Sequence, residues 1–322
     1  MNNVKIPTLK ELETAEPAFY GGHRLCAGCA EGTIVRQVLD AARYAEFDGA
    51  KTDLKDPYPV VVGVATGCLE VATTPCPYTS WGVPTLHNAF ENVAATMSGV
   101  VEAYSVMRKK GRLASKKEYR FVAFAGDGGT YDIGFQSLSG ALERGHKFLY
   151  VCLNNEGYMN TGIQRSSATP YGAWTTTTNA GKVEWRKNLT EIIAAHGIPY
   201  VAQAAPFSTK PRDLYEKVGR AFEAEGSAFM NILSPCSRGW RFPEGDTIKL
   251  ARLAVETCYW PLFEIIEGKW TLNYKPKAKM PVVEFLSAQE KFKGVLGDKE
   301  KVAYIQNRID QEWQTLLTKC GV

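Results

Sequence analysis

The feature that most constrains the fold is a pair of glycine-containing turns separated by one α/β crossover. The first turn contains Gly-Asp-Gly-Gly around Asp127, and the second contains Asn-Asn-Glu-Gly around Asn155. The 25 residues between Gly128 and Asn154 are enough for one helix and one strand. Such a crossover predicts that both turns lie at the ends of neighbouring parallel strands. An acidic oxygen and an amide oxygen are therefore expected to face each other over a glycine turn.

Helical and strand-like patterns alternate along nearly the whole chain. Strands are expected at residues 59–65, 121–125, 147–153, 200–204, 228–233 and 262–266, and helices at 31–44, 86–107, 134–144, 189–196, 211–225 and 247–258. The expected strands are continuous apolar runs, which is typical of strands buried on both faces of a parallel sheet. The predicted fold class is α/β, a doubly wound and mostly parallel sheet with helices on both faces.

The predicted domain organisation is one α/β domain over residues 1–273 and a C-terminal extension over residues 274–322 that contacts partner subunits. The extension begins with lysines around two prolines, which favours an extended chain, and helices are expected near 283–292 and 299–319. The segment 160–182 has little periodicity and is too long for a passive connection. A functional loop is therefore expected there.

The composition indicates an ordinary globular protein and excludes several classes. The chain has 322 residues, of which 45% are apolar and 22% charged. Its net charge of +4 is too small to predict nucleic-acid binding, and no apolar run approaches the roughly 18–20 residues of a membrane span. The first residues lack the apolar core of a secretory signal, so a cytoplasmic protein is expected. The basic run between residues 108 and 120 is interpreted as a solvated helix end, with docking of an acidic partner as the alternative.

The Gly-Asp-Gly-Gly turn has the composition of a phosphate- and cation-binding site. Glycine removes the Cβ atoms where the backbone must approach phosphate oxygens closely. Asp127 offers a carboxylate oxygen and Asn155 an amide oxygen, both suited to Mg²⁺, and the carbonyl of Gly157 could complete the protein ligands. The alternative is a structural aspartate that caps the following helix. The glycines concerned are Gly126, Gly128 and Gly129.

The two turns together resemble the signature of thiamine diphosphate enzymes. The longer string from Asn155 to Ala173 is similar to the β subunits of pyruvate:ferredoxin oxidoreductase and its 2-oxoacid relatives. The resemblance extends from Gly22 to about Pro281. It includes the blocks Ala65–Cys68, Pro77–Trp81, His87–Asn92 and Cys236–Arg241. These blocks are long and specific to the family.

This resemblance implies a thiamine diphosphate site built around the two turns. Asp127, Asn155 and the Gly157 carbonyl are expected to hold Mg²⁺. Asn160 is the expected catalytic residue, because its neutral amide would face the reacting carbons and stabilise an oxyanion without supplying a proton. For His87, the alternative to a cofactor-side role is a hydrogen-bonded histidine that begins a helix. The rest of the expected cofactor-binding set comprises Thr66, Gly67, His87 and the three glycines of the first turn.

Four of the eight cysteines form a candidate metal site. Cys26 and Cys29 are separated by two residues, and Cys68 and Cys236 each follow an expected strand. Four thiolates from distant segments can hold either zinc or a [4Fe–4S] cluster, and their spacing does not choose between the two. The resemblance implies a proximal [4Fe–4S] cluster on these four residues. A cofactor that gives up electrons also needs an acceptor nearby, a role that zinc does not fill.

The function that the resemblance implies is that of the catalytic β subunit of a 2-oxoacid:ferredoxin oxidoreductase. Pyruvate is the expected substrate, and coenzyme A, CO₂ and ferredoxin are the other expected reactants. Within the family, oxalate without coenzyme A and branched 2-oxoacids remain open as substrates. Two alternatives lie outside the family, namely a thiamine-dependent decarboxylase without a cluster and a zinc-stapled scaffold that binds a nucleotide diphosphate.

One component of thiamine chemistry is not expected on this chain. The reaction needs a glutamate beside the aminopyrimidine ring, and in two-domain thiamine enzymes that glutamate comes from the partner domain. A single α/β domain of this size supplies the diphosphate half of the site. An obligate complex with α-, γ- and δ-type subunits is therefore predicted.

Overall fold

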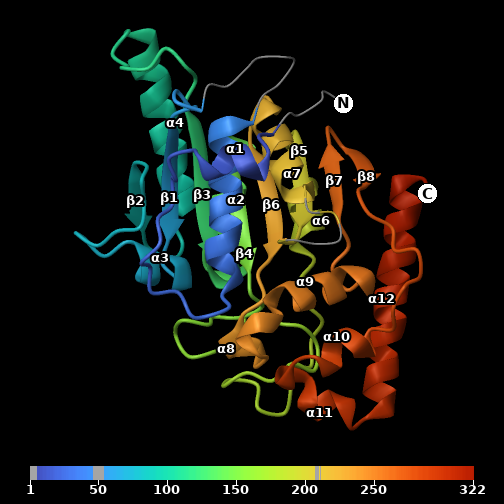
Figure 1. Ribbon diagram of the computed structural model, residues 1–322. Coiled ribbons are helices and arrows are strands. Elements are labelled where there is room, and N and C mark those ends of the chain that lie inside the picture. Colours follow the sequence, from blue (N-terminus) through green and yellow to red (C-terminus); the bar gives the residue numbers. More distant parts are fainter. Residues whose placement is uncertain (1–5, 46–53, 207–209, 211) are drawn as a thin grey trace.

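The computed structural model describes residues 6–45, 54–206, 210 and 212–322, and within them the chain forms an eight-stranded sheet (Figure 1). The strand order is β2-β1-β3-β4-β6-β5-β7-β8. The strands are β1 (Val60–Ala65), β2 (Thr85–Asn88), β3 (Arg120–Gly126), β4 (Leu149–Asn154), β5 (Tyr200–Ala204), β6 (Ala228–Leu233), β7 (Phe263–Ile266) and β8 (Lys269–Leu272). All pairs from β2 to β5 are parallel, and β7 and β8 add an antiparallel edge. The mostly parallel sheet that the apolar runs predicted is confirmed.

Helices cover both faces of this sheet (Figure 1). They are α1 (Leu9–Glu13), α2 (Ala30–Tyr44), α3 (Cys68–Thr73), α4 (Val93–Lys109), α5 (Phe135–Glu143), α6 (Leu189–Ala194), α7 (Asp213–Glu223), α8 (Ser237–Trp240), α9 (Thr247–Glu256), α10 (Val283–Ser287), α11 (Lys293–Leu296) and α12 (Lys299–Cys320). Three single-turn helices are η1 (Gly128–Asp132), η2 (Glu244–Asp246) and η3 (Glu290–Phe292).

The sheet is buried on both sides, which explains why its strands lack alternating polarity. Helices α1, α2 and α7 share one apolar core with side chains such as Val122 and Val151. Helices α4, α5, α6 and α12 share the opposite core with the next residues of the same strands, Ala123 and Cys152. Because successive side chains of a strand point to opposite faces, both positions must be apolar.

The order of the strands creates a switch point between β1 and β3. The chain runs outward from β1 to β2 in one direction, and from β3 to β4 in the other. In open α/β sheets, ligands bind beyond the carboxyl ends of the strands at such a point. The segments that begin there are Thr66–Cys68, after β1, and Asp127–Gly129, after β3.

The expectation of one long helix over residues 86–107 is wrong at its beginning. Residues Thr85–Asn88 form the edge strand β2, and α4 starts only at Val93. β2 pairs with β1, and the carbonyl of Asn88 accepts hydrogen bonds from both the backbone N–H (2.8 Å) and the hydroxyl (2.9 Å) of Thr66. These long-range bonds outweigh a weak local preference for helix.

The C-terminal segment folds against the rest of the chain. Its apolar residues Val282, Phe285 and Phe292 are buried in a third core with Trp240 and Leu250. Helix α12 also contacts β8 at the antiparallel edge of the sheet. The expected helices near 283–292 and 299–319 are present as α10, η3 and α12. Contact between this segment and partner subunits stays a prediction.

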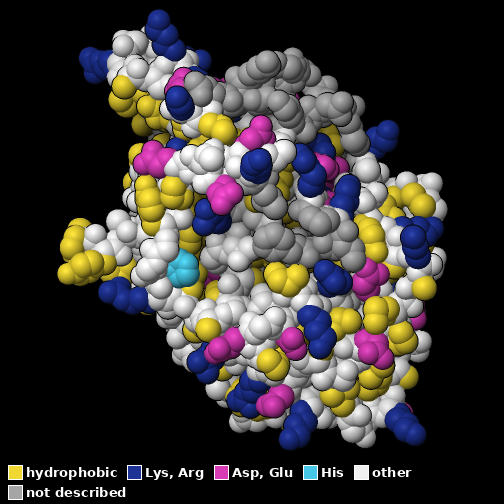
Figure 2. Space-filling view, viewed as in Figure 1, with side chains coloured by type: hydrophobic (Ala, Val, Ile, Leu, Met, Phe, Trp, Pro, Cys, Tyr) yellow, Lys and Arg dark blue, Asp and Glu magenta, His cyan; other side chains and the backbone are white. Residues whose placement is uncertain are grey.

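The surface mixes charges of both signs. On the face shown in Figure 2, Lys and Arg side chains lie interspersed with Asp and Glu side chains. The end of α4 protrudes from the molecule and carries the exposed Arg108, Lys109 and Lys110 (Figures 1 and 2). Lys117, further along the same basic run, pairs with Asp56 at 2.8 Å. In the described ranges, every helix is too short or too polar to span a lipid bilayer.

Candidate active site

Asp127 lies at the switch point, at the start of the helical turn η1 that follows β3. Its side chain is fully buried. The Ser166 hydroxyl donates to Oδ2 (2.5 Å), and the Asn155 backbone N–H donates to Oδ1 (3.2 Å). Burial raises the pKa of the Asp127 carboxyl to about 7, although the donors from Ser166, Gly157 and Asn155 lower it. A cation beside this carboxylate would favour its charged form.

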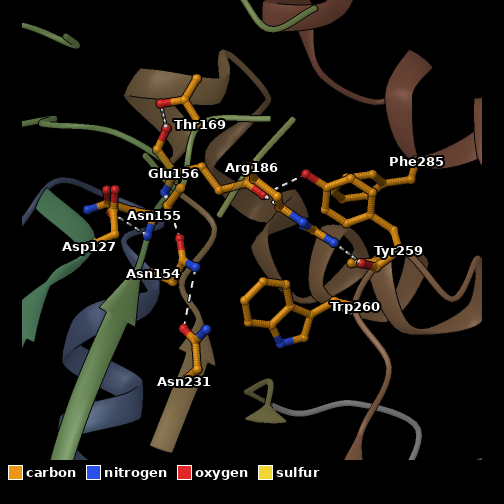
Figure 3. Close-up of polar contacts among 12 residues, drawn as sticks. Asp127, Asn154, Asn155, Glu156, Thr169, Arg186, Asn231, Tyr259, Trp260 and Phe285 are labelled. Carbon is orange, nitrogen blue, oxygen red and sulfur yellow. Dashed lines mark hydrogen bonds and ion pairs between the residues drawn. The ribbon is translucent and has the colours of Figure 1, made fainter. Parts of the chain in front are cut away.

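Asn155 follows β4 directly and presents a free oxygen near Asp127 (Figure 3). Its Nδ2 donates to Oε1 of Glu31 (3.1 Å), which fixes the orientation of the amide because a carboxylate oxygen needs a donor. Oδ1 of Asn155 is then buried without a hydrogen-bond partner among the described residues. A buried oxygen of this kind suits a hard cation such as Mg²⁺.

A cavity opens between the ends of β1, β3 and β4, and we call it the glycine cavity. A Cβ atom on Gly126 would meet no atom within 4 Å, so this glycine leaves open space for a ligand. A Cβ on Gly128 would lie 2.2 Å from the Tyr158 ring, and one on Gly129 would lie 3.0 Å from the Phe90 carbonyl. Both positions therefore require glycine for packing as well. The predicted residues that line this cavity are Thr66, Gly67, Gly126, Gly128, Gly129, Asn155, Gly157 and Asn160.

The four predicted cysteines line a second cavity of about 160 Å³, which we call the cysteine cavity. Cys29 precedes α2, Cys68 begins α3 and Cys236 precedes α8, while Cys26 lies exposed in the loop before α2. The cysteines are free thiols. Among the described residues, no three His, Cys, Asp or Glu side chains are grouped closely enough to form a metal site.

The chemistry of the cysteine cavity suits a positively charged centre. Burial raises the pKa of Cys29, Cys68 and Cys236, the last to about 11, and the carboxylate of Glu31 and neighbouring thiolates raise these pKa values further. The thiols are therefore neutral near pH 7 without a cation. Metal binding would stabilise their thiolate forms. The backbone N–H of Gly239 already donates to Sγ of Cys236 (3.2 Å).

The glycine cavity and the cysteine cavity share one wall. Glu31, Cys68, Asn155 and Asn160 line both of them. The side chain of Asn160 also makes a hydrogen bond to Cys68, which lowers the pKa of that thiol. The residue expected to face the reacting carbons is therefore in direct contact with a residue expected to hold the metal centre.

Two predicted site residues line neither cavity: Asp127, which is buried behind the glycine turn, and His87. The expectation that His87 begins a helix is wrong, because it lies in the edge strand β2. Its side chain is 57% exposed, and its Nδ1 lies 2.7 Å from Oε1 of Glu70. A role of His87 in cofactor binding stays a prediction.

Comparison with known proteins identifies the family of the chain. Residues 65–232 match the family described as thiamine pyrophosphate enzyme, C-terminal TPP binding domain. The chain is 48% identical to pyruvate synthase subunit PorB of Thermotoga maritima over 96% of this chain and 94% of that protein. It is 47% identical to PorB of Methanocaldococcus jannaschii, over 94% of this chain and 97% of that one. The chain belongs to this family of thiamine-dependent 2-oxoacid oxidoreductase subunits.

One relative carries a different substrate in its name. The ketoisovalerate oxidoreductase subunit VorB of Pyrococcus abyssi is 41% identical over 94% of this chain and 93% of that protein. Among solved structures, the 2-oxoglutarate:ferredoxin oxidoreductase from Magnetococcus marinus aligns with a TM-score of 0.52 and 21% identity, over 77% of this chain and 81% of that chain. This last likeness supports the fold. The predicted family, fold class and oxidoreductase class are confirmed.

Two residues of the candidate site, Ser166 and Glu31, were missed by the sequence analysis, and Trp240 was placed only within the block Cys236–Arg241. Ser166 donates to Asp127 from the loop that was expected to be functional. Glu31 lies two residues after Cys29, and burial raises the pKa of its carboxyl to about 7. Trp240 donates from its ring N–H to the carbonyl of Asn155 (2.7 Å). Glu31 had no distinctive local signal, because an acidic residue is common in the first turn of a helix.

Proposed function

We propose that the chain is the thiamine diphosphate-binding β subunit of a pyruvate:ferredoxin oxidoreductase. The observation that carries this proposal is the wall shared by the glycine cavity and the cysteine cavity. The two cavities share the lining residues Glu31, Cys68, Asn155 and Asn160. An organic redox cofactor in one cavity would therefore lie next to a one-electron acceptor in the other. This arrangement suits oxidative decarboxylation better than a reaction with a single cofactor.

The glycine cavity would hold Mg²⁺ and the diphosphate of the cofactor. Asp127, Asn155 and the carbonyl of Gly157 are the proposed Mg²⁺ ligands, supported by the buried carboxylate and the unpartnered amide oxygen. The open space over Gly126 admits phosphate oxygens to the backbone. When bound, thiamine diphosphate supplies a nucleophilic carbon and an electron sink for decarboxylation of a 2-oxoacid.

Asn160 has the position and chemistry of the catalytic residue. It lies on the shared wall, and its amide is a neutral donor that can bind a developing oxyanion without releasing a proton. The four cysteines of the cysteine cavity would hold a [4Fe–4S] cluster, which supplies a one-electron acceptor when bound. Because burial raises the pKa of Cys29, Cys68 and Cys236, binding of the cluster would have to displace their protons.

Partner subunits would complete the reaction. The glutamate for the aminopyrimidine ring would come from another subunit, and relatives named as subunits support such a complex. Ferredoxin would accept the electrons, and coenzyme A the acetyl group. Pyruvate is favoured as substrate by the names of the relatives at 47–48% identity, whereas the 41% identical VorB keeps a branched 2-oxoacid as the second candidate.

The test is turnover by the anaerobically purified complex. With pyruvate, coenzyme A, thiamine diphosphate and Mg²⁺, it should reduce ferredoxin, and omission of coenzyme A should suppress turnover. Oxalate and 2-oxoisovalerate, each with and without coenzyme A, identify the substrate. A complex that reduces no acceptor with any 2-oxoacid, or that contains zinc but neither iron nor sulfide, contradicts the proposal.

A matched pair of cysteine variants tests the cluster assignment. Cys68→Ser should lower the iron and sulfide content and silence acceptor reduction. Cys76→Ser is the control, because Cys76 lies outside the cysteine cavity; it is exposed, whereas Cys68 is partly buried. Equal iron content in the two variants would contradict the assignment of Cys68, and activity retained in Cys68→Ser would favour a decarboxylase without a cluster.

A further inference from the structure

Glu156 lies between the two proposed Mg²⁺ ligands Asn155 and Gly157, in a conformation that its residue type disfavours. Its backbone φ is +66°, in the left-handed region that side chains with a Cβ rarely occupy. The residue is only 2% exposed, so no solvent compensates for this conformation. Such a conformation persists only where the surroundings over-determine it.

Every polar group of Glu156 has a partner that fixes this conformation (Figure 3). Its backbone N–H donates to Oδ1 of Asn154 (3.1 Å), and its carbonyl accepts from the Thr169 hydroxyl (2.8 Å). The Tyr259 hydroxyl donates to Oε1 (2.6 Å), and the Lys291 ammonium pairs with Oε2. The direction of the ligand loop 155–157 is thus set from residues spread over the whole chain.

The cation on Glu156 comes from the C-terminal segment. Lys291 belongs to η3 and is 4% exposed, and its Nζ lies 3.7 Å from the centre of the Trp240 ring. The same Trp240 donates its ring N–H to the carbonyl of Asn155. Lys291 therefore contacts the ligand loop in two ways. It forms an ion pair with Glu156, and it packs on the Trp240 ring, which donates to the carbonyl of Asn155.

A second cation, Arg186, lies farther from the Glu156 carboxylate than Lys291 does. Arg186 approaches Oε1 of Glu156 at 3.7 Å, while its NH2 donates to the carbonyl of Tyr259 (2.7 Å) and its guanidinium lies 4.3 Å from the centre of the Tyr259 ring. Arg186 therefore mainly anchors Tyr259. The close charge partner of the Glu156 carboxylate is Lys291.

We propose that Lys291 is a positioning residue for the cofactor site. By pairing with Glu156 beneath the ligand loop, it holds the Asn155 amide oxygen and the Gly157 carbonyl directed at the Mg²⁺–diphosphate group. This inference rests on the proposed function, because it takes that group as the ligand of the loop. Groups behind metal ligands commonly set ligand direction and affinity.

The experiment compares variants in the full complex after removal of its thiamine diphosphate. Lys291→Met removes the cation, and Lys291→Arg keeps it. The double variant Glu156→Gln/Lys291→Met removes both charges of the close pair and leaves Arg186 as the cation beside residue 156. The matched control is Asp213→Asn/Lys217→Met, which removes an equally buried pair (2.7 Å) on α7. Affinity for thiamine diphosphate with Mg²⁺ is measured by quenching of tryptophan fluorescence, beside the melting temperature and the iron content.

We expect Lys291→Met and the double variant to bind thiamine diphosphate roughly 10- to 100-fold more weakly, with iron content unchanged. Lys291→Arg should bind it nearly as well as the parent complex. The control should lose a similar number of degrees in melting temperature and keep its affinity. Equal affinities in the double variant and the control would overturn the proposal. A parent complex that binds no thiamine diphosphate would instead overturn the proposed function, and this inference with it.

Discussion

The glycine cavity and the cysteine cavity share a wall but are prepared for their ligands in different ways. Beside the glycine cavity, the buried carboxylate of Asp127 accepts hydrogen bonds from the Ser166 hydroxyl and from the backbone N–H of Asn155. In the cysteine cavity, the thiols come from separate segments, Cys26 is exposed, and Sγ of Cys236 accepts a hydrogen bond at the start of α8. Hydrogen bonds within the chain orient the carboxylate of Asp127, whereas the four thiols would be brought into one ligand set by the metal centre itself.

Removal of the Asp127 carboxylate gives the strongest test of this difference between the two cavities. Asp127→Ala should weaken binding of thiamine diphosphate with Mg²⁺ by roughly 100- to 1,000-fold, since a buried charge partner of the cation is lost. The iron content should not change, because Asp127 does not line the cysteine cavity. Titration followed by tryptophan fluorescence measures the affinity. Asp246→Ala, at the partly exposed start of α9, is the control, and an equal loss there would contradict the assignment.

The shared wall predicts an effect on turnover rather than on binding. Asn160→Ala should lower kcat by about 100-fold, the magnitude typical of a lost oxyanion donor, with KM for the 2-oxoacid nearly unchanged. Steady-state kinetics of ferredoxin reduction measure both constants. Asn307→Ala, on the exposed side of α12, should leave kcat as it is. A rise in KM at constant kcat would show that Asn160 serves in binding alone.

Removal of iron should increase amide hydrogen exchange around the cysteine cavity and leave exchange around the glycine cavity unchanged. Chelation of iron from the complex should raise amide hydrogen exchange by about tenfold around Cys26–Cys29 and Ser237–Trp240, because buried neutral thiols attract one another weakly. Exchange in β3 and β4 should stay unchanged. Mass spectrometry of exchanged peptides provides the measurement. Equal loosening around Asp127 would mean that the two cavities are not independently prepared.

The smallest effect concerns the pH dependence of the prepared site. Burial raises the pKa of Asp127 to about 7, so protons compete with the cation, and affinity for Mg²⁺–thiamine diphosphate should fall by up to about tenfold per pH unit below 7. The same raised pKa makes the cofactor-free chain lose stability as the pH rises from about 4 to 7, since the folded state holds the proton more tightly.

Ser166→Ala sharpens that test. The Ser166 hydroxyl lowers the pKa of Asp127, so its loss should move the pH midpoint of cofactor affinity upward by a fraction of a unit. Ser234→Ala is the matched control, because Ser234 is an equally buried serine that lines the cysteine cavity. Affinity titrations between pH 6 and 8 would measure both shifts, and an equal shift in the two variants would rule out a direct effect on Asp127.

Much of the fold could be predicted because strands that are buried on both faces appear in the sequence as continuous apolar runs. Strands such as β5 and β6 are continuous apolar runs, and their bounds were predicted to the residue. The edge strand β2 was missed, since its four residues carry no such run and owe their conformation to pairing with β1. The short strand β8 was missed for the same reason, because it pairs with β7 alone.

The candidate site divides in a similar way. Asp127, Asn155 and Cys68 could be found because each follows a predicted strand, where parallel sheets bind ligands. The residues behind them could not be found. Lys291 and Glu156 meet across 135 positions of sequence, and neither position stands out in its own neighbourhood. A buried pair of this kind can be identified only from the three-dimensional structure, which brings the two distant segments together.

The separation of Lys291 from Glu156 along the chain also has a consequence for biosynthesis. A ribosome adds roughly 5–20 residues per second, so the 135 positions after Glu156 take on the order of 10 s to translate. During that interval the nascent subunit already carries its glycine turn but lacks the lysine that directs the loop. On the proposal above, a nascent chain that has not reached residue 291 would bind the coenzyme more weakly than the folded subunit.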